Sequence, residues 1–368
     1  MRVAINATEI GRNRGGNESY LLGLLDGLRS LPDSGDRLTL IACQAGATIL
    51  SAQSWPGRFD LVDTGPWSRW PSYLWQQTQA LRRTRAEWYL STFLLPPVIP
   101  CRAGVLIHDL SFRAHPDYFP IHIALYMAML VGWAVRRAQV VIALSEFTRS
   151  ELERFYPSAL PKTRVVYPGV SREFTTEGDL AIDRAALREY GIEPPYILAV
   201  GNIHPRKNLG RLLDAYERLR QVRADLPGMV WVGVERWGSA QLQQRARATG
   251  VQLTGRVAPE HLPAFYRQAA LLVYPSLYEG FGLPALEAMA CGTPVVASST
   301  TSLPEVVGDA ALVADPTDVA ALSEAMARAL FDETLRAQWR TRGLARAGQF
   351  NWATTAERVL ASLKAIEA

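Results

Sequence analysis

The chain has 368 residues, more than one hydrophobic core usually serves, so two domains are expected. Hydrophobic residues make up 48% of it and charged residues 20%, which is typical of a folded globular protein and excludes a disordered one. The formal net charge of +4 is small for this length, so it suits anionic ligands and does not indicate nucleic-acid binding.

The cysteines and the apolar runs indicate a cellular compartment. The three cysteines, Cys43, Cys101 and Cys291, have no paired spacing, so neither a disulfide framework nor a zinc site is expected. We see no signal-peptide pattern at the N-terminus, and the apolar run at 123–135 is too short to span a membrane. The sequence therefore predicts a cytoplasmic protein that could meet a membrane from one side only.

Short apolar, β-branched runs alternate with helical periodicity along the whole chain. In the first half the predicted strands are residues 2–6, 38–43, 59–63, 88–92, 105–109, 140–145 and 164–169. In the second half they are residues 196–201, 229–234, 251–255, 270–276, 293–298 and 310–315. Amphipathic helices fit residues 17–31 and 351–366. This alternation predicts an α/β protein with two doubly wound parallel sheets in tandem.

The alternation lapses into polar, charged sequence between residues 171 and 194 and then restarts at residue 196. We therefore expect an N-terminal domain over 1–175, a linker over 176–194, a second domain over 195–350 and a C-terminal helical segment over 351–368.

Doubly wound domains bind ligands outside the carboxyl ends of their strands, so the loops there are the candidate sites. In the first half, Gly15 and Gly16 precede a helix, and His108 ends a strand. The glycines do not match the dinucleotide fingerprint G-x-G-x-x-G, and a plain tight turn explains them equally well. His108 is placed to hydrogen-bond a ligand, although a lone histidine is more often structural.

Trp/Arg-rich sequence covers residues 67–88. It interleaves tryptophans with arginines, namely Trp67, Trp70, Trp75 and Trp88 with Arg69, Arg82, Arg83 and Arg85. Such a pattern can rest on anionic lipid headgroups, but core tryptophans beside a solvated arginine face explain it more simply.

In the second half, the loop "VGNIHPRKNL" carries Arg206 and Lys207 near the start of a helix, where the helix dipole disfavours cations. Their position makes sense if an anion shares the site, and a solvated basic pair is the alternative.

The stretch "YEGFGLPALEAM" places Glu279 and Glu287 on either side of a glycine-rich loop that leads into a helix. Gly282 allows close backbone approach, and the free N–H groups of a helix start suit a phosphate. Glu287 lies one turn into the helix, where its carboxylate suits two adjacent hydroxyls, as on a ribose. A capping acid and a solvated loop acid are the alternatives.

These motifs together resemble glycosyltransferase family 4, the retaining, nucleotide-sugar-dependent enzymes with the GT-B fold. The likeness rests on "GNIHPRKN", "GRVAPEHLPAFYRQA", "YPSLYEGFGLPALEAMACGTPVVAS" and "LPEVVGDAALVADPTD", in the family's order, and on "GGNESY", "HDLSF" and "VVIALSEFTRSEL" in the first half. It implies two Rossmann-like domains facing a central cleft, with the donor held by the second and the C-terminal helix crossing back to the first.

The resemblance also implies roles for particular residues. Glu287 would bind the ribose hydroxyls, and Glu279 the hydroxyls of the transferred sugar, assisted by the backbone amides of the loop residues Phe281, Gly282 and Leu283. The remaining roles are a diphosphate clamp (Arg206, Lys207, Gly15, Gly16), a contact to the donor sugar (His108) and the base pocket (Arg256, Val257).

One departure concerns the residue after the strand-end glycine, where some family members carry arginine and this chain has Asn202; Arg206 would take over that role. No cofactor or metal is expected, because GT-B enzymes neutralise the leaving diphosphate with basic side chains and helix dipoles.

The resulting hypothesis is a hexosyltransferase that uses a GDP-mannose or UDP-glucose type of donor. Its acceptor would be a saccharide or lipid-linked molecule in polysaccharide or glycolipid synthesis, with peripheral contact with the inner face of a membrane as a further expectation. The alternatives are a GT-B nucleotide-sugar epimerase and a non-catalytic sugar-nucleotide binding protein.

Overall fold

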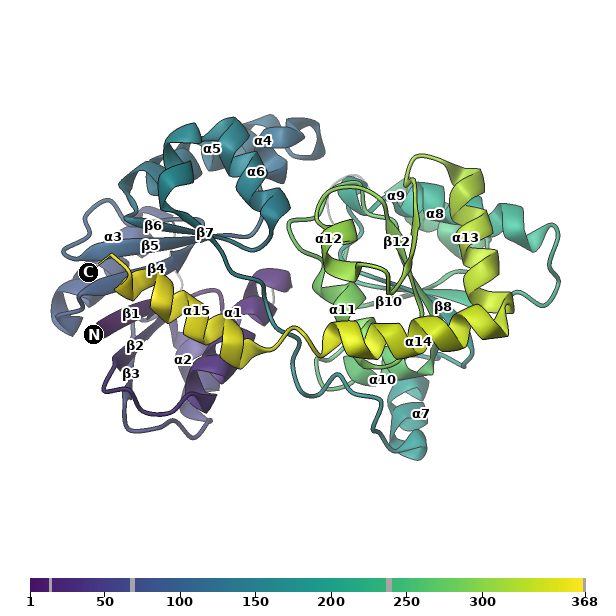
Figure 1. The fold of residues 1–368 in the computed structure, drawn as a ribbon, viewed down its shortest axis with the longest axis horizontal. Helices are drawn as coiled ribbons and strands as arrows, with labels where there is room; N and C mark the ends of the chain where they lie inside the picture. The colour runs from purple at the N-terminus through teal and green to yellow at the C-terminus, as the bar shows by residue number, and fades with distance from the viewer. Residues whose placement is uncertain (13–14, 67–69, 236–239, 367–368) are drawn as a thin grey trace. The chain divides into compact units, whose positions relative to one another are not determined.

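The computed structural model describes residues 1–12, 15–66, 70–235 and 240–366, with only the backbone of residues 70–74. Contacts divide the chain into two units, Met1–Gly169 with Asn351–Ala368, and Val170–Phe350 (Figure 1). Each unit is a parallel sheet with helices packed on it, as the alternating pattern predicts.

The first unit contains a seven-stranded sheet in the order β3-β2-β1-β4-β5-β6-β7. Its strands are β1 (Arg2–Asn6), β2 (Arg37–Ala42), β3 (Phe59–Asp63), β4 (Trp88–Thr92), β5 (Arg102–Ile107), β6 (Val140–Ala143) and β7 (Thr163–Val165). Its helices are α1 (Gly16–Ser30), α2 (Gln44–Ser51), α3 (Trp70–Thr84), α4 (Ser111–Ala114), α5 (Ile121–Arg137), α6 (Glu146–Phe155) and α15 (Trp352–Lys364), with 3₁₀ turns η1 (Pro116–Tyr118) and η2 (Pro157–Lys162). The strand order reverses between β1 and β4.

The second unit repeats this topology with six strands in the order β10-β9-β8-β11-β12-β13. These strands are β8 (Tyr196–Val200), β9 (Gly228–Val232), β10 (Gln252–Gly255), β11 (Ala269–Tyr274), β12 (Val295–Ser298) and β13 (Leu312–Ala314). Its helices are α7 (Leu180–Arg188), α8 (Leu209–Arg220), α9 (Ala240–Ala248), α10 (Leu262–Gln268), α11 (Leu283–Ala290), α12 (Leu303–Val307), α13 (Val319–Phe331) and α14 (Glu333–Ala347), with the 3₁₀ turn η3 (Pro205–Lys207). Its order reverses between β8 and β11.

Every predicted strand is confirmed, with ends that shift by up to four residues. The strand predicted over 105–109 stops at Ile107 because Asp109 Oδ1 accepts hydrogen bonds from the N–H and hydroxyl of Ser111 (2.9 and 2.7 Å), which turns the chain into α4. The expected helices over 17–31 and 351–366 are α1 and α15.

The linker expected over 176–194 is instead part of the second unit. It contains α7, which Asp179 caps, and Asp183 on this helix is 2% exposed. Arg267 of α10 forms a two-pronged ion pair with the Asp183 carboxylate, at 2.8 and 2.5 Å. The charged sequence that suggested a linker therefore reflects a buried ion pair and a solvated helix face.

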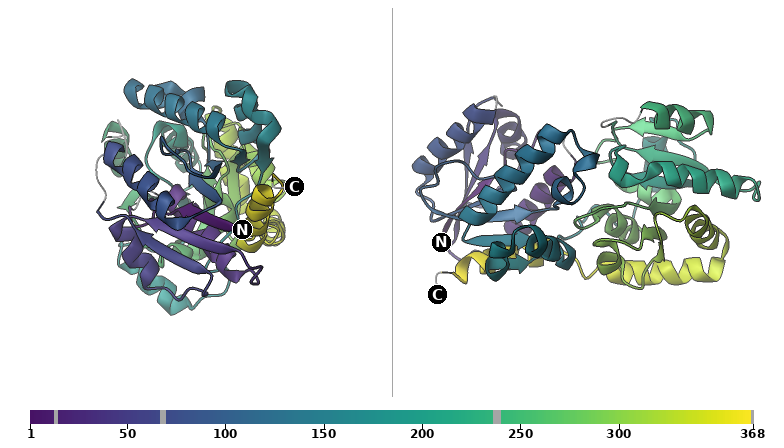
Figure 2. Two further views of the ribbon diagram at one scale, coloured as in Figure 1. Left: turned by 90° about the vertical axis from the view of Figure 1, so that its left-hand side faces the viewer. Right: turned by 90° about the horizontal axis from the view of Figure 1, so that it is seen from above.

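The first unit is closed by α15, the last helix of the chain, which lies along α1. A Cβ at Gly23 would stand 2.0 Å from the Trp352 ring, and one at Gly27 would stand 2.1 Å from the Trp352 carbonyl oxygen. The two chain ends lie close together (Figure 2), where Asp36 pairs with the α-amino group at 3.1 Å and with Lys364 at 2.7 Å.

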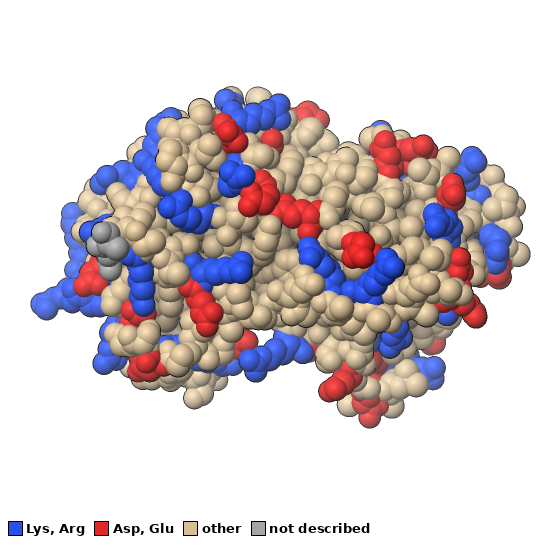
Figure 3. Space-filling view, viewed as in Figure 1, with Lys and Arg blue, Asp and Glu red and all other residues tan. Residues whose placement is uncertain are grey.

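The Trp/Arg-rich stretch is only partly described, since Trp67 and Arg69 lie outside the described residues. Trp88 is fully buried in β4, whereas Trp75 on α3 is 58% exposed. No helix among the described residues is both long enough and apolar enough to cross a bilayer. On the face drawn in Figure 3, basic and acidic side chains lie interspersed, in keeping with the small net charge. Contact with a membrane stays a prediction.

Candidate functional site

In the second unit, the basic loop follows β8 and the glycine-rich loop follows β11, the two strands between which the strand order reverses. Open parallel sheets bind ligands at this point, because neighbouring loops there lead away to opposite faces. The topology therefore brings together two loops that the sequence separates by about 70 residues.

The basic loop is a 3₁₀ turn, η3, and the side chain of His204 caps it: its Nδ1 accepts a hydrogen bond from Arg206 N at 3.3 Å. Asn208 follows in the left-handed conformation (φ +57°), and its side-chain amide donates to the carbonyl oxygens of Pro275 and Pro316 (3.1 and 2.6 Å). The N–H of Leu277 donates to the carbonyl of Arg206 at 2.7 Å. These bonds fix the turn against the loop that follows β11.

Glu279 is the centre of a buried ion cluster. Its Oε2 accepts a hydrogen bond from Arg206 Nη1 at 2.8 Å, and its Oε1 accepts one from Lys207 Nζ at 2.5 Å. The side chains of Glu279 and Lys207 are 7% and 10% exposed, whereas that of Arg206 is 24% exposed. Burial alone would raise the pKa of Glu279, but the two cations overcome it and hold the pKa at about 2.

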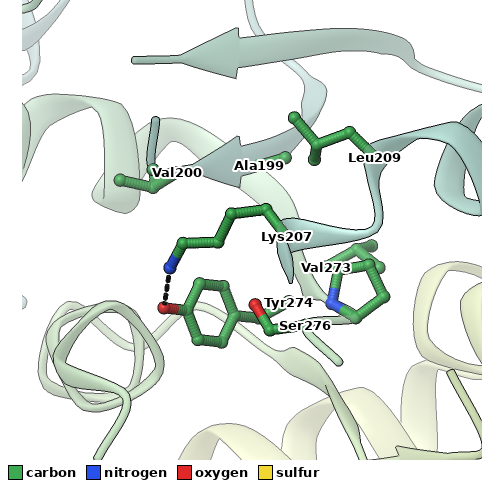
Figure 4. Close-up of a pocket in the computed structure, with 9 residues that line it drawn as sticks. Ala199, Val200, Lys207, Leu209, Val273, Tyr274 and Ser276 are labelled. Atoms are coloured by element: carbon green, nitrogen blue, oxygen red, sulfur yellow. Dashed lines mark hydrogen bonds between the residues drawn. The ribbon is translucent and has the colours of Figure 1, made fainter. Parts of the chain in front are cut away.

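Tyr274, the last residue of β11, completes the cluster. Its hydroxyl accepts a hydrogen bond from Lys207 Nζ at 2.6 Å, and the ammonium stands 4.6 Å from the ring centroid (Figure 4). Burial, together with the charge of Glu279, raises the pKa of Tyr274 well above its ordinary value, so the phenol stays neutral. The pocket beside Lys207 is also lined by Gly201, whose φ of +135° and close approach to the lysine stem leave no room for a Cβ without movement.

The glycine-rich loop ends at Gly282, which occupies the cap position of α11 with φ +117°. A Cβ there would lie 2.5 Å from Leu303, so both the backbone and the packing require glycine. Ser302 Oγ lies 2.9 and 2.8 Å from the carbonyl oxygens of Glu279 and Phe281 and braces the loop. No described side chain caps α11; Pro284 has no N–H and Ala285 N donates to the Gly282 carbonyl at 3.0 Å, so the N–H of Leu283 and the helix dipole make this N-terminus suited to an anion.

Glu287 lies one turn into α11, as expected, and its Oε2 accepts a hydrogen bond from the hydroxyl of Tyr266 at 2.7 Å. The side chain is partly exposed. Desolvation raises the pKa of Glu287 to about 7, against the hydrogen bond from Tyr266 and with the help of the Glu173 charge. Near neutral pH this carboxyl is poised between its two protonation states.

Arg256 and Val257 follow β10 in a separate loop. Arg256 is exposed and Val257 is 8% exposed, and the next residue, Ala258, donates its N–H to the hydroxyl of Tyr190 at 3.0 Å.

In the first unit, His108 follows β5 and is 8% exposed. Its ring lies 4.7 Å from that of Tyr20 and 5.2 Å from that of Phe93, and no hydrogen-bond partner reaches its Nε2 among the described residues. Burial lowers the pKa of His108 to about 4 against the nearby Asp109, so the imidazole is neutral at physiological pH.

Gly15 and Gly16 stand at the N-terminus of α1. Gly15 takes the cap position with φ +83°, and no side chain of the described residues caps the helix. A tight turn explains Gly15, but a Cβ on Gly16 would meet nothing within 4 Å, so packing does not require that glycine. An open, uncapped helix start suits an anionic ligand.

Two protein-family models match the chain: "Glycosyltransferase Family 4" over residues 14–174 and "Glycosyl transferases group 1" over residues 184–346. The O-antigen chain mannosyltransferase B of Escherichia coli is 38% identical over 257 residues, which cover 68% of this chain and 67% of that protein. The chain belongs to glycosyltransferase family 4.

Other relatives of this glycosyltransferase are longer. This chain is 30% identical over 268 residues to the serotype-specific mannosyltransferase WbdA of Escherichia coli, and the match covers 70% of this chain but only 33% of that protein. Sucrose-phosphate synthase from Thermosynechococcus elongatus has the same fold, with a TM-score of 0.80 over 100% of this chain and 99% of that one at 20% identity. Anabaena HepE in complex with UDP-glucose matches with a TM-score of 0.75 over 99% of this chain and 100% of that one, at 18% identity. The fold is GT-B.

The structure of this glycosyltransferase brings Arg206, Lys207 and Glu279 into direct contact. The loop residues Phe281, Gly282 and Leu283 continue from this cluster into α11, whereas Glu287 bonds to Tyr266 instead. Gly15, Gly16 and His108 lie in the first unit.

Sequence reasoning missed the three tyrosines that hold these residues, Tyr20, Tyr266 and Tyr274. Only Tyr274 could have been found from the sequence, because it is the last residue of a buried strand just before the glycine-rich loop. Tyr20 and Tyr266 read as ordinary apolar positions of amphipathic helices.

Proposed function

We propose that this glycosyltransferase is a retaining, metal-independent hexosyltransferase. Its donor is a nucleotide-diphosphate hexose of the GDP-mannose or UDP-glucose type, and its acceptor is a saccharide or lipid-linked molecule in polysaccharide or glycolipid synthesis. The single observation that carries the proposal is the buried cluster of Arg206, Lys207 and Glu279 at the switch point of the second sheet. The names of the mannosyltransferase relatives support a hexose, and HepE, in complex with UDP-glucose, supports a nucleotide-sugar donor.

The charges of the cluster suit a leaving diphosphate. Breaking the anomeric C–O bond builds negative charge on the diphosphate and positive charge on the sugar. Arg206 and Lys207, already oriented by hydrogen bonds and largely removed from water, would stabilise the former without reorganisation. The uncapped N-terminus of α11 adds partial positive charge beside them.

Glu279 would hold hydroxyls of the transferred sugar, assisted by the backbone amides of Phe281, Gly282 and Leu283. A carboxylate with a pKa of about 2 is a poor proton donor or acceptor near neutral pH, which favours a positioning role over acid/base catalysis. The acceptor hydroxyl would attack from the face that the diphosphate leaves, and a diphosphate oxygen would take its proton, so configuration is retained.

The remaining contacts are assigned by chemistry. Ionised Glu287 would accept hydrogen bonds from two ribose hydroxyls, and the loop at Arg256 and Val257 would contact the base. Gly15 and Gly16 would contribute N–H groups to the diphosphate, and neutral His108 would bond to the donor sugar.

A panel of GDP- and UDP-sugars with saccharide and lipid-linked acceptors tests the activity. Release of nucleoside diphosphate together with a new glycoside of retained configuration supports the proposal. A chemically altered sugar nucleotide without a glycoside would indicate an epimerase, and binding without turnover would indicate a non-catalytic protein. Unchanged rates after treatment with EDTA are expected.

Substitution of the clamp tests the mechanism. Lys207→Ala should lower kcat by roughly 10² or more, because it removes a buried cation aimed at the leaving group. Arg218→Ala, which removes an exposed cation on α8, is the matched control. A near-wild-type rate in Lys207→Ala would place the diphosphate clamp elsewhere.

A further inference from the structure

The chain leaves the second unit at Phe350 and enters the first at Asn351. Asn351 is extended (φ −134°, ψ 148°), and its side chain caps α15 by accepting a hydrogen bond from Thr354 N at 2.8 Å. Phe350 and Trp352 lie on either side of Asn351, and their rings pack in the second and the first unit respectively. Both are buried, at 7% and 5% exposure.

Trp352 packs in the first unit against positions that are occupied by glycine. Its ring occupies the place of a side chain at Gly23, and its backbone N would stand 2.3 Å from a Cβ at Gly169. The ring meets that of Tyr20 edge to face, with centroids 5.3 Å apart and an interplanar angle of 81°. Tyr20, 1% exposed, therefore contacts both Trp352 and His108 with its ring.

The orientation of His108 depends on these rings. Because no described group hydrogen-bonds to its Nε2, the packing of Tyr20 and Phe93 holds the imidazole in place. The hydroxyl of Tyr20 also has no hydrogen-bond partner among the described residues, so Tyr20 acts on His108 through its ring.

Phe350 makes the corresponding contact in the second unit. Its ring packs against that of Phe281 in the glycine-rich loop, with centroids 5.8 Å apart and an angle of 68°. The guanidinium of Arg346 also lies over the Phe350 ring, 4.9 Å from its centroid, and donates hydrogen bonds to the carbonyl oxygens of Val306 and Glu305 at 2.9 and 2.6 Å.

We propose that Phe350 and Trp352 are positioning residues for sugar transfer: Trp352 orients His108 through Tyr20, and Phe350 orients the glycine-rich loop through Phe281. The inference rests on the proposed function, since it takes His108 and the loop as donor-binding groups. Each contact lies within one unit. Two residues separated only by Asn351 thereby support donor-binding groups in both units.

A purely structural role would affect stability alone, whereas positioning predicts a division of kinetic effects. Displacement of a reacting contact by about 1 Å can lower a rate about 10²-fold. Loss of Trp352 should therefore lower kcat, and loss of Phe350 should chiefly raise the KM of the donor, because it loosens the loop that binds it.

The first experiment does not depend on the proposed function. The imidazole pKa of His108 is followed by NMR, its signal being assigned by its loss in His108→Gln. Trp352→Ala should raise this pKa from about 4 by roughly one unit, because water reaches the ring once Tyr20 loses its support. Trp352→Phe should restore a value near that of the wild type. An unchanged pKa in Trp352→Ala would overturn the inference.

The control is Leu363→Ala, which truncates an equally buried side chain on α15 about three turns from Trp352 and should leave the His108 signal in place. If Trp352→Ala does not fold, Tyr20→Leu removes the intermediate ring and should give the same rise. A shift as large in Leu363→Ala would mean general loosening of the unit and would overturn the inference.

The second experiment measures kinetics with the donor that the sugar-nucleotide panel identifies. Trp352→Ala should lower kcat by roughly 10- to 100-fold with donor KM within about threefold of wild type, and Trp352→Phe should recover most of it. Phe350→Ala should raise donor KM about tenfold. Equal changes of both parameters in both variants would overturn the positioning role.

The His108→Ala variant distinguishes failure of the proposed role of His108 from failure of the positioning role of Trp352. If its kcat matches that of the wild type, the proposed role of His108 fails, and this inference fails with it even though the NMR result stands. If its kcat falls while Trp352→Ala remains fully active, the proposed function stands and the positioning role alone is overturned.

Discussion

Two glutamates eight positions apart in one loop and helix have opposite electrostatic surroundings. Glu279 is buried between two cations, which hold its pKa at about 2, whereas Glu287 is partly exposed beside a neutral tyrosine, and desolvation raises its pKa to about 7. The difference is decided by the neighbours, because two cations offset the desolvation of Glu279, whereas a hydrogen bond from Tyr266 alone opposes that of Glu287. A donor that brings ribose hydroxyls to Glu287 would supply the hydrogen bonds its charged form lacks.

Glu287→Gln tests this at the residue scale. A carboxyl whose folded pKa is raised stabilises the fold fully below its ordinary pKa of 4.5, and this contribution is lost as the pH rises through about 7. The variant, which never ionises, should therefore melt at a higher temperature than the wild type at pH 8, by roughly a few degrees, and show little difference at pH 4.5.

The same variant should bind nucleoside diphosphate more weakly at pH 8, by about tenfold in calorimetry, since a neutral amide accepts less strongly from two hydroxyls. Wild-type affinity should rise with pH through about 7. Equal melting curves and equal affinities at both pH values would remove Glu287 from the ribose site.

The elements show how glycine decides which helices can meet. Helix α15 reaches α1 only because Gly23 and Gly27 have no side chains, and α11 begins at Gly282 only because that residue tolerates a positive φ. The prediction of α1 and α15 was correct, but the sequence did not predict that they pack together. An amphipathic pattern shows that a helix has an apolar face and does not show which element covers it.

Gly23→Ala should therefore destabilise the first unit. The new Cβ would stand 2.0 Å from the Trp352 ring, which must move, so we expect a loss of about 1–3 kcal/mol in the free energy of unfolding by denaturant titration. Gly57→Ala is the matched control, because a Cβ there meets nothing within 4 Å. Equal stabilities of the two variants would contradict the close packing of α15.

At the scale of the whole molecule, the first unit is discontinuous, since residues 351–368 complete a body made otherwise of residues 1–169. Trp352, Val359 and Leu363 bury their side chains there, so the last helix is part of that unit's core. Stability of the first unit thus depends on sequence that follows the entire second unit.

Truncation after Phe350 tests this dependence. Amide hydrogen exchange in α1 should accelerate markedly, while β8 and β11 keep their protection, because the second unit retains all its own residues. Truncation after Ala365, which spares α15, is the control. Unchanged protection of α1 after the longer truncation would show that the helix is dispensable.

The sequence by itself determined the thirteen strands of the described residues, the α/β class and the family, because buried parallel strands are short continuous apolar runs and because the loops that follow them carry chemically distinctive residues. The tertiary structure alone decided that Tyr274 holds Lys207, that Asp183 pairs with Arg267 and that Trp352 packs against Tyr20. These contacts join residues far apart in the chain, and their partners are chosen by strand order and by the space that glycines leave, neither of which local periodicity encodes.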